Sequence, residues 1–364
     1  MKIGILTFHC AHNYGAVLQC YALQETLKSM GHDVEVIDYR PKYLILPYKR
    51  FNIKWFCRKN LIKILKRISS EIKLYHTRRN RYNNFNNFIT KRLNLSSKIA
   101  NNFIPDIYDI YIIGSDQVWN KKITWGFDPI YWGEFKHSTT NKVITYAASM
   151  EANKIKEEDV SVIRRLLENF NYISVREETL KHLLDNISNK YIKVVLDPTL
   201  IANTQIWDKI IKYPQTNRKY ILIYQYAKNI NILRIANSIA KQIDSDVINI
   251  TTDFLTKDNG KAISLYDISP EAFIGYIKKA SLIITPTFHA TAFSIIFNKP
   301  FYFVKFKNVE NTRVKTLLTN IQLNDRIINE TDSPVFSGID YSKANICLNE
   351  LQKESISFLK EAGL

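Results

Sequence analysis

The sequence predicts an α/β protein of two doubly wound domains that face each other across a cleft, and three observations lead to this prediction. The chain has 364 residues, which is more than one ordinary hydrophobic core accommodates. Apolar residues make up 46% of the chain and charged residues 23%, as in globular rather than disordered proteins. Strand-like runs alternate with helical patterns from the first residues onward, and the alternation starts again after residue 200.

The first domain is expected at residues 1–200. It opens with a strand at 2–7, a helix at about 15–30 that Gly31 terminates, and a strand at 34–37, which is typical of the start of a parallel sheet. A basic helical insertion follows at about 40–100. Four more strands are expected at 109–113, 143–147, 172–175 and 192–196, with helices at about 157–170 and 177–184.

The second domain is expected at residues 201–345. Its strands are predicted at 220–224, 247–250, 281–284 and 301–304, and its helices at 230–242, 270–280 and 289–297. Pro270 stands near the first turn of its helix, where proline is well tolerated. A helical pattern at about 343–360 predicts a closing C-terminal helix, which we assign to residues 346–364.

The composition excludes several kinds of protein. The four cysteines form no C-x-x-C pair and the seven histidines show no metal-ligand spacing, so neither a disulfide framework nor a metal or other cofactor is expected. There is no run of about 18 uncharged apolar residues, so no helix is expected to cross a bilayer. The apolar start of the chain is too short for a signal peptide, and we expect a cytoplasmic protein.

The positive charge of the chain is concentrated in one segment. The formal net charge is +17, and between Arg40 and Arg92 there are 16 Lys and Arg residues against one acid, Glu71, a local net charge of +15. The rest of the chain is close to neutral. The excess charge is therefore a local feature that requires its own explanation.

A helical wheel over this segment separates an apolar face from a basic one. The apolar face holds Ile53, Cys57, Leu61, Ile64, Leu65 and Ile68. The basic face holds Arg58, Lys59, Lys63, Lys66 and Arg67, with Lys54 as an exception, and Tyr48, Phe51, Trp55 and Phe56 stand before or within the first turn. Segment 40–92 is therefore predicted to dock peripherally on an anionic membrane surface. A helix that packs between domains is the main alternative, and nucleic acid is not expected because no recognised binding module is present.

In doubly wound sheets, ligands bind at the carboxyl ends of the strands, so the loops at these ends are the places to search. In the loop after the first strand, Asn13 and Gly15 permit a tight turn into a helix whose free backbone N–H groups can hold an anion. Together with Tyr14 they are candidate substrate-binding residues. The loop lacks G-x-G-x-x-G, the dinucleotide fingerprint, and an ordinary strand-to-helix turn is the plain alternative.

The loop after the strand at 109–113 concentrates polar side chains. Gly114 lets the backbone approach a ligand closely. Ser115, Asp116, Gln117 and Trp119 follow it, a combination that suits a polyhydroxylated ligand. Alternatively, the serine and the aspartate cap the next helix and the tryptophan belongs to the core.

Two more strand ends supply candidate chemical groups. Arg176 follows the strand at 172–175, where it can hold a carboxylate or phosphate with two hydrogen bonds or form an ordinary surface ion pair. His289 follows a buried strand and begins a helix, with Thr287 and Thr291 beside it. A lone histidine is usually structural, but one at such a strand-to-helix switch is a candidate for proton transfer.

These loops, in this order, resemble the polysaccharide pyruvyl transferase family. The resemblance is carried by Asn13-Tyr14-Gly15-Ala16 with Leu18-Gln19, Gly114-Ser115-Asp116-Gln117-Val118-Trp119, Ser174-Val175-Arg176-Glu177, Leu196-Asp197-Pro198-Thr199, Phe288-His289-x-x-x-Phe293-Ser294 with Pro300, and further on Arg313-Val314-x-x-Leu317. Each motif is weak alone, but together in register they are specific.

The resemblance implies both a fold and an activity. The fold would be similar to that of the GT-B glycosyltransferases, with two Rossmann-like domains. The protein would be a transferase that moves a pyruvyl group from phosphoenolpyruvate onto a sugar of a surface polysaccharide, such as a capsule or exopolysaccharide, or of its lipid-linked precursor. A ketal would form, and no step of this chemistry requires a metal or a nucleotide.

The resemblance also assigns roles to residues. His289 would be the general acid, and Asp116 would accept the proton of the attacking hydroxyl. Many family members carry an arginine two positions before the histidine, where this chain has Thr287. Another cation must then hold the carboxylate of the donor, and Arg176 and Arg313 are the candidates, with Thr287 and Thr291 beside them.

Two other classes of protein remain open. One is a glycosyltransferase of the same architecture that uses a sugar nucleotide, although no convincing ribose-binding Glu motif follows residue 280. The other is a non-catalytic glycan-binding relative, which the threonine at position 287 makes conceivable.

Overall fold

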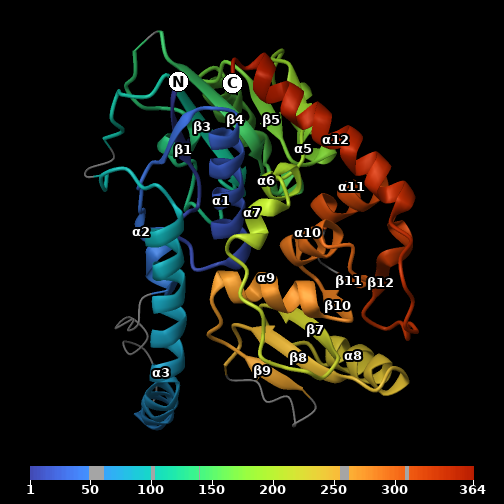
Figure 1. Ribbon diagram of the computed structural model, residues 1–364. Helices are drawn as coiled ribbons and strands as arrows, with labels where there is room; N and C mark the ends of the chain where they lie inside the picture. Colours follow the sequence, from blue (N-terminus) through green and yellow to red (C-terminus); the bar gives the residue numbers. More distant parts are fainter. Residues whose placement is uncertain (49–60, 100–102, 139, 255–261, 308–310) are drawn as a thin grey trace.

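The computed structural model describes residues 1–48, 61–99, 103–138, 140–254, 262–307 and 311–364. These residues form two six-stranded sheets, each with all its strand pairs parallel, and the sheets belong to the upper and lower halves of the molecule in Figure 1. The strand orders are β2-β1-β3-β4-β5-β6 and β12-β11-β10-β7-β8-β9. The prediction of two doubly wound, Rossmann-like α/β domains is confirmed.

The first domain contains the sheet that begins at the N-terminus. Its strands are β1 (Lys2–Leu6), β2 (Asp33–Val36), β3 (Ile110–Asp116), β4 (Lys142–Ala148), β5 (Ile173–Val175) and β6 (Ile192–Val194). Its helices are α1 (Tyr14–Ser29), α2 (Lys42–Ile45), α3 (Leu61–Arg92), α4 (Glu157–Leu167), α5 (Glu178–Asp185), α6 (Pro198–Ile201) and α7 (Gln205–Asp208). Short 3₁₀ turns lie at η1 (Leu46–Tyr48), η3 (Pro129–Trp132) and η4 (Ala152–Lys154).

The second domain repeats the alternation of strands and helices. Its strands are β7 (Tyr220–Gln225), β8 (Asp246–Thr251), β9 (Ile263–Leu265), β10 (Leu282–Thr285), β11 (Phe301–Lys305) and β12 (Ile327–Asn329). Its helices are α8 (Ile230–Gln242), α9 (Pro270–Lys279), α10 (Phe288–Ile296) and α11 (Thr312–Asn320), with a 3₁₀ turn at η5 (Asn324–Arg326). The predicted boundary near residue 200 falls between the last strand of one sheet and the first strand of the other.

Both faces of each sheet are buried, which is why the strands are apolar without alternation. In the first sheet Ile3 and Ile112 face one hydrophobic cluster, while Leu6 and Ile113 face another. In the second sheet Leu222 belongs to the same cluster as Ile3. One hydrophobic core therefore continues from the first domain into the second and fixes their mutual position.

The closing helix connects the second domain to the first. Helix α12 (Ser342–Glu361) begins four residues before the predicted 346 and runs from the second domain back to the first (Figure 1). The Ser355 hydroxyl accepts a hydrogen bond from the backbone N–H of Leu196 at 2.9 Å. The Lys142 ammonium donates to the backbone carbonyl of Ala362 at 3.0 Å. The C-terminal helix thus holds the edge of the first sheet against the second domain.

The described second half of α3 packs between the domains. Phe85, Phe88 and Ile89 are buried in the shared core. Asn84 donates a hydrogen bond of 2.5 Å to the backbone carbonyl of Asp267 in the second domain. This part of the basic segment is therefore a packing helix, which was the alternative to membrane docking. Side chains of this helix are described from residue 74 onward, so the whole of the predicted amphipathic face, 53–68, lies outside the described side chains. No described helix is long and apolar enough to cross a membrane.

The main departure from the predicted elements concerns β3. The run Gly114-Ser115-Asp116 was expected to be a loop, but β3 continues through it, and Asp116 pairs with Ala148 of β4. The glycine has a φ of 118°, and a Cβ atom at this position would overlap the carbonyl oxygen of Tyr146. The glycine is therefore required for close approach of two strands, rather than of a ligand.

Candidate active site

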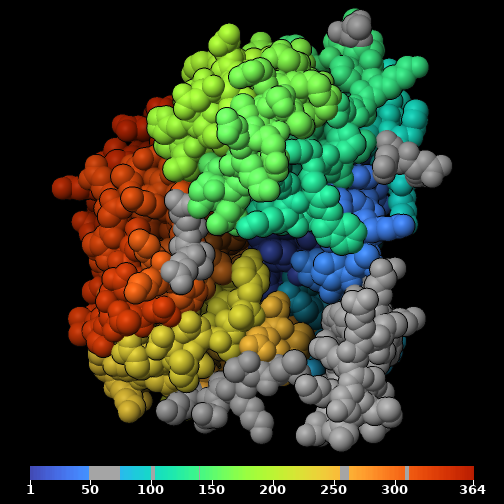
Figure 2. Space-filling model, turned by 180° about the vertical axis from the view of Figure 1, so that it is seen from behind, coloured from blue at the N-terminus to red at the C-terminus, as the bar shows by residue number. Residues whose placement is uncertain are grey.

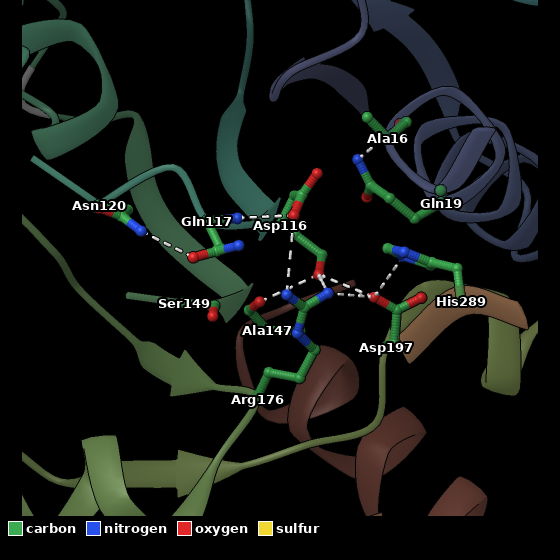
Figure 3. A network of polar contacts seen from close by, with 12 residues as sticks. Ala16, Gln19, Asp116, Gln117, Asn120, Ala147, Ser149, Arg176, Asp197 and His289 are labelled. Atoms are coloured by element: carbon green, nitrogen blue, oxygen red, sulfur yellow. Dashed lines mark hydrogen bonds and ion pairs between the residues drawn. The ribbon is translucent and has the colours of Figure 1, made fainter. Parts of the chain in front are cut away.

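The carboxyl ends of both sheets meet at one place between the domains. Asp116 ends β3, Arg176 follows β5 and Asp197 follows β6, all in the first domain. His289 lies in the first turn of α10, just after β10 of the second domain. Figure 3 shows Arg176 and His289 on either side of Asp197. This arrangement joins an acid, a base and a cation from both halves of the molecule.

Asp197 is the centre of the polar network. Its buried carboxylate accepts hydrogen bonds from Arg176 Nη1 at 2.7 Å, from Ser115 Oγ at 3.2 Å and from Thr199 Oγ1 at 2.7 Å. Burial alone would raise the pKa of this carboxyl group, but the positive charges of His289 and Arg176 outweigh it and lower the pKa. Asp197 is therefore a fixed negative charge beneath the cleft.

His289 is held against this charge. Its Nε2 atom lies 3.5 Å from Asp197 Oδ2, and its side chain is 11% exposed. This separation is long for a hydrogen bond, and Nε2 has no hydrogen-bond partner among the described residues. On the other side the ring packs so closely on α1 that a Cβ atom at Gly15 would overlap it. The imidazole is thus clamped between the two domains and is positioned by packing and by charge.

Arg176 is more buried than a ligand-binding arginine was expected to be. Its side chain is 2% exposed, its Nη1 atom is bound to Asp197, and the Phe288 ring centroid lies 4.9 Å from the guanidinium carbon. Nη2 lies 3.7 Å from the carboxylate of Asp116 without a hydrogen bond. Nη1 of the guanidinium is therefore occupied by the protein. The predicted bidentate contact with a ligand would have to use Nη2 and Nε, which have no hydrogen-bond partner among the described residues.

Arg313 is the more accessible of the two predicted arginines. It is half-buried near the start of α11, and burial followed by the positive charge of Arg176 lowers its pKa. Glu177 lies near both arginines. Its Oε1 accepts a hydrogen bond of 2.8 Å from the Ser149 hydroxyl. Burial raises the pKa of Glu177 against the opposing effect of both arginines. The two arginines therefore lie near each other and line one pocket.

Asp116 and Gln117 lie at the same edge. The Asp116 side chain is 13% exposed, and its Oδ1 accepts a hydrogen bond of 2.8 Å from the backbone N–H of Gln117. The side-chain oxygen of Gln117 accepts a hydrogen bond of 2.7 Å from Asn120, which leaves its amide NH₂ pointing elsewhere (Figure 3). Both predicted residues therefore remain candidates for contact with a substrate.

Two predicted ligand residues are core residues instead. Trp119 is fully buried, stacks on Trp132 with ring centroids 4.5 Å apart, and donates to the backbone carbonyl of Tyr131. Tyr14 is fully buried and stacks on Phe273 of the second domain at 4.4 Å. Large aromatic rings contribute most when fully buried, so their apolar area explains these positions without a sugar.

Thr291 is also a structural residue. Its buried hydroxyl donates to the backbone carbonyl of Thr287 within α10 at 3.0 Å, a common bond for threonine inside a helix. Thr287 forms a hydroxyl–hydroxyl hydrogen bond of 2.9 Å with Thr285. The threonine at the position of the usual family arginine is thus 7% exposed and already has a partner.

The first loop has a structural role as well. Asn13 Oδ1 accepts the backbone N–H groups of Gly15 at 2.9 Å and Ala16 at 3.4 Å, and thereby caps α1. The predicted anion site loses these two donors to the asparagine. Asn13 also donates to the Tyr226 hydroxyl of the second domain at 3.1 Å, so it bridges the cleft.

The space-filling view shows the molecule hollowed between the domains (Figure 2). One pocket, of about 80 Å³, is lined by residues of both, including Arg176, Asp197, Phe288 and Arg313. Among the described residues, no three His, Cys, Asp or Glu side chains are grouped as metal ligands. Its lining combines these two arginines with the carboxylates of Asp197, Glu178 and Glu354.

The sequence does not single out Asp197 as a site residue. Its motif, Leu196-Asp197-Pro198-Thr199, carries part of the family resemblance but indicates no role for the carboxylate. The sequence pattern that could have indicated a site residue is an acidic residue at the carboxyl end of a strand, followed by proline. The same pattern is typical of a residue that caps the N-terminus of a helix, so it does not distinguish the two roles. Asp197 is such a cap, because it accepts the backbone N–H of Thr199 at 3.0 Å, and it holds Arg176 in addition.

Asp197 thus joins the two Rossmann-like domains, because it binds Arg176 of the first domain and lies 3.5 Å from His289 of the second. A family model described as polysaccharide pyruvyl transferase matches residues 13–308, which is more than half of the chain. The chain therefore belongs to the polysaccharide pyruvyl transferase family. It is accordingly a transferase, and its family acts in the pyruvylation of polysaccharides.

Searches against individual proteins give weaker similarities. No curated protein matches the chain. Similar solved structures include a UDP-GlcNAc 2-epimerase from Neisseria meningitidis, with 11% identity over 100% of this chain and 94% of that chain and a TM-score of 0.47. They also include the glycosyltransferase SnogD from Streptomyces nogalater, with 9% identity, 98% and 96% coverage and a TM-score of 0.42. With scores below 0.5, these similarities carry no argument about activity.

Proposed function

We propose that this chain transfers a pyruvyl group from phosphoenolpyruvate onto a sugar of a surface polysaccharide, or of its lipid-linked precursor, and forms a ketal. The observation that carries the proposal is the position of His289 Nε2, 3.5 Å from the buried carboxylate of Asp197, which also binds Arg176. This arrangement provides a proton donor next to a site for a doubly anionic ligand.

The donor carries a carboxylate and a phosphate, and the two arginines are the groups that we propose for binding them. Arg313, the more accessible arginine, makes the direct contact with the anionic donor. Arg176 adds positive charge from below and keeps Asp197 in place through the bond at 2.7 Å. The pocket that both arginines line is the proposed site for the anionic groups.

The first step is addition to the enol double bond. A sugar hydroxyl attacks C2 of phosphoenolpyruvate, and Asp116 accepts its proton. The electron pair of the C2–C3 double bond takes a proton from His289 at C3, which becomes a methyl group. The negative charge of Asp197 stabilises the imidazolium before transfer, and the packing of Gly15 against the ring limits its movement.

The second step closes the ketal. The bond between C2 and the phosphate oxygen breaks, and phosphate leaves with the electron pair. The oxygen of a second sugar hydroxyl then bonds to C2, and its proton ends on phosphate. One hydroxyl proton is thus transferred in net terms to C3 and the other to phosphate, so atoms and electrons balance without an oxidant or reductant.

The proposal is tested with the purified protein, phosphoenolpyruvate and a lipid-linked sugar acceptor. We expect phosphate release that depends on the acceptor, together with an acid-labile product that carries one additional carboxylate. Consumption of a sugar nucleotide, with phosphoenolpyruvate untouched, would instead indicate a glycosyltransferase. Absence of turnover with either donor would indicate a non-catalytic glycan-binding relative.

The two arginines are expected to affect donor binding differently. Replacement Arg313→Gln should raise the KM for phosphoenolpyruvate by about tenfold or more, because a charge-assisted hydrogen bond is worth about 1.5–3 kcal/mol. Arg176→Lys should raise the same KM and also lower stability, because a buried partner of Asp197 is changed. Arg218→Gln, at an exposed position, is the control. An unchanged KM in both variants would remove the arginines from the donor site.

We also propose that the basic segment 40–92 brings the enzyme to the cytoplasmic face of an anionic membrane, where a lipid-linked acceptor would lie. The support is the local charge of +15. Binding to anionic liposomes in flotation should weaken with salt, and it should decrease when four charges are removed, each worth about 1 kcal/mol. The variant carries glutamine at Lys59, Lys63, Lys66 and Arg67.

A second variant separates local from general charge effects. It removes four exposed lysines far from the segment and should bind liposomes as the wild type does. Its substitutions, also to glutamine, are at Lys154, Lys156, Lys353 and Lys360. If the wild type fails to float with anionic vesicles at low salt, the acceptor is reached without this segment.

A further inference from the structure

Helix α1 carries a buried polar side chain that has no role in the mechanism proposed above. Gln19 is fully buried, and its motif, Leu18-Gln19, is part of the family resemblance. Its NH₂ group donates hydrogen bonds to the Thr7 hydroxyl at 2.9 Å and to the backbone carbonyl of Ala16 at 3.0 Å. Its side-chain oxygen has no hydrogen-bond partner among the described residues, which costs free energy in a buried place. An apolar side chain of similar size would avoid this cost, so the NH₂ group is what requires an explanation.

The bonds of Thr7 fix the polarity of this contact. Thr7 follows β1, and its hydroxyl donates to the backbone carbonyl of Ser115 at 2.8 Å. A hydroxyl has one proton, so the Thr7 oxygen must accept from Gln19, and the NH₂ group of Gln19 must face it. The opposite orientation of the amide would also place its oxygen against the carbonyl of Ala16. We call this chain of two bonds, from Gln19 through Thr7 to Ser115, the relay.

The relay ends beyond the ladder that joins β1 and β3. The two strands pair as far as Leu6 and Ile113, whereas β3 continues to Asp116. The Thr7 hydroxyl therefore reaches the Ser115 carbonyl at a point where the ladder has already ended. This carbonyl belongs to the peptide group that joins Ser115 to Asp116, so the relay acts on the backbone of the proposed base.

Asp116 has a backbone conformation that its surroundings must hold. Its φ is 79°, in the left-handed region that costs free energy for most residues other than glycine. Such a conformation persists only where neighbouring contacts determine it. The residue before it is held on both sides, because the Ser115 carbonyl is bound by Thr7 and the Ser115 hydroxyl lies 3.0 Å from the carbonyl of Ala147. The direction of the Asp116 carboxylate therefore depends on how Ser115 is fixed.

Helix α1 is connected to both groups that we propose for proton transfer. Gly15 and Gln19 are four residues apart and thus lie on one face of the helix. Gly15 packs against the ring of His289, while Gln19 is linked to Asp116 by the relay. In the view of Figure 3, the Gln19 side chain extends from α1 toward Asp116. One helix therefore contacts the group from the second domain and the backbone of the group from the first.

We propose that Gln19 is a positioning residue for Asp116, and that α1 sets the distance between the proposed base and the proposed general acid. The inference rests on the proposed function for the roles of Asp116 and His289, but not for the relay itself. Gln19 holds the peptide group that aims the Asp116 carboxylate at an acceptor hydroxyl. A base accepts a proton only within hydrogen-bond reach, so a small shift of this carboxylate lowers the rate of the chemical step rather than the affinity for the donor.

The first test is phosphate release by Gln19→Met, which fills a similar volume without the NH₂ group. We expect kcat to fall by about 10–100-fold at an unchanged KM for phosphoenolpyruvate. The matched control is Gln24→Met, because Gln24 is also fully buried on α1 but donates to the backbone carbonyl of Arg92, at the end of α3. The control should lose stability and keep its kcat. A folded Gln19→Met protein with wild-type kcat would overturn the proposal.

Further variants determine whether the effect passes through the relay to Asp116. Thr7→Val removes the hydroxyl and should lower kcat as Gln19→Met does, whereas Thr7→Ser keeps the hydroxyl and should retain most of the rate. In an Asp116→Asn background, Gln19→Met should cause no further loss, because the group that it positions is already absent. Losses that multiply in this background would mean that the glutamine acts elsewhere, and the proposal would be wrong.

Hydrogen exchange of the free protein separates this inference from the proposed function, because it requires neither donor nor acceptor. Backbone N–H groups in peptides that cover residues 112–120 should exchange about tenfold faster in Gln19→Met and Thr7→Val than in Gln24→Met. If the wild type releases no phosphate but exchange rises in this way, the proposed function fails and the relay stands. Equal exchange in Gln19→Met and Gln24→Met would overturn the relay, whatever the activity of the wild type.

Discussion

His289→Ala is expected to lower turnover by about 10²–10⁴-fold while the protein remains folded, the usual effect of losing a general acid. The histidine lies against Asp197, the carboxylate that also binds Arg176, and its side chain is 11% exposed. Phosphate release at saturating phosphoenolpyruvate measures the effect. The loss should appear in kcat, because protonation of C3 occurs in the transition state rather than in binding.

Two further variants make this result specific. His289→Gln keeps a polar group beside Asp197 but has no proton to transfer, so it should be as inactive as the alanine variant. His182→Ala changes an exposed histidine on α5 and should retain full activity. If a folded His289 variant keeps wild-type turnover, the proton donor is another group and the proposed mechanism is wrong.

The order and type of the main elements were predictable because their signals are local. Helix α8 was predicted with its observed bounds, and the buried strands of both sheets were recognised as short apolar runs. Helix α11 was not predicted, although Val314, Leu317, Leu318 and Ile321 have helical spacing. Strand β12 has three residues, too few for periodicity to indicate it.

The site was predictable only at the level of loops. The sequence indicates which segments lie at the carboxyl ends of strands, and Asp116, Arg176 and His289 do lie there. It does not indicate which side chains turn inward. Trp119 was expected to contact a sugar, but its pairing with Trp132 depends on a chain segment thirteen residues away folding beneath it.

The contact between Asp197 and His289 could not be derived from the sequence in the same way. The two residues are on different domains, and their approach depends on the shared core that fixes those domains together. Arg176 and Asp197 belong to the same domain, but they follow different strands, so the bond that Asp197 makes in place of a ligand also depends on the assembled sheet. Local sequence patterns predict helices and strands, whereas the pairing of charged side chains from distant segments depends on the assembled fold.

Gly15→Ala is expected to lower turnover by about a hundredfold without unfolding the chain. A Cβ atom at Gly15 would overlap the His289 ring, so the imidazole must move away from Asp197, and a shift of about 1 Å in a catalytic group can cost about 10²-fold in rate. Alanine is otherwise favourable by up to about 1 kcal/mol in a helix, so α1 itself should not be weakened. The matched control is Gly338→Ala, because a Cβ atom there would meet no neighbour within 4 Å.

A double variant tests whether the glycine acts through the histidine. Once His289 is alanine, the ring that Gly15→Ala displaces is absent, so the second substitution has nothing left to disturb. Gly15→Ala combined with His289→Ala should therefore turn over at the rate of His289→Ala alone, while two independent effects would multiply. Multiplied losses, with melting temperatures unchanged, would mean that the glycine serves another purpose, such as the approach of the two domains, and that the position of the imidazole is not what limits the rate.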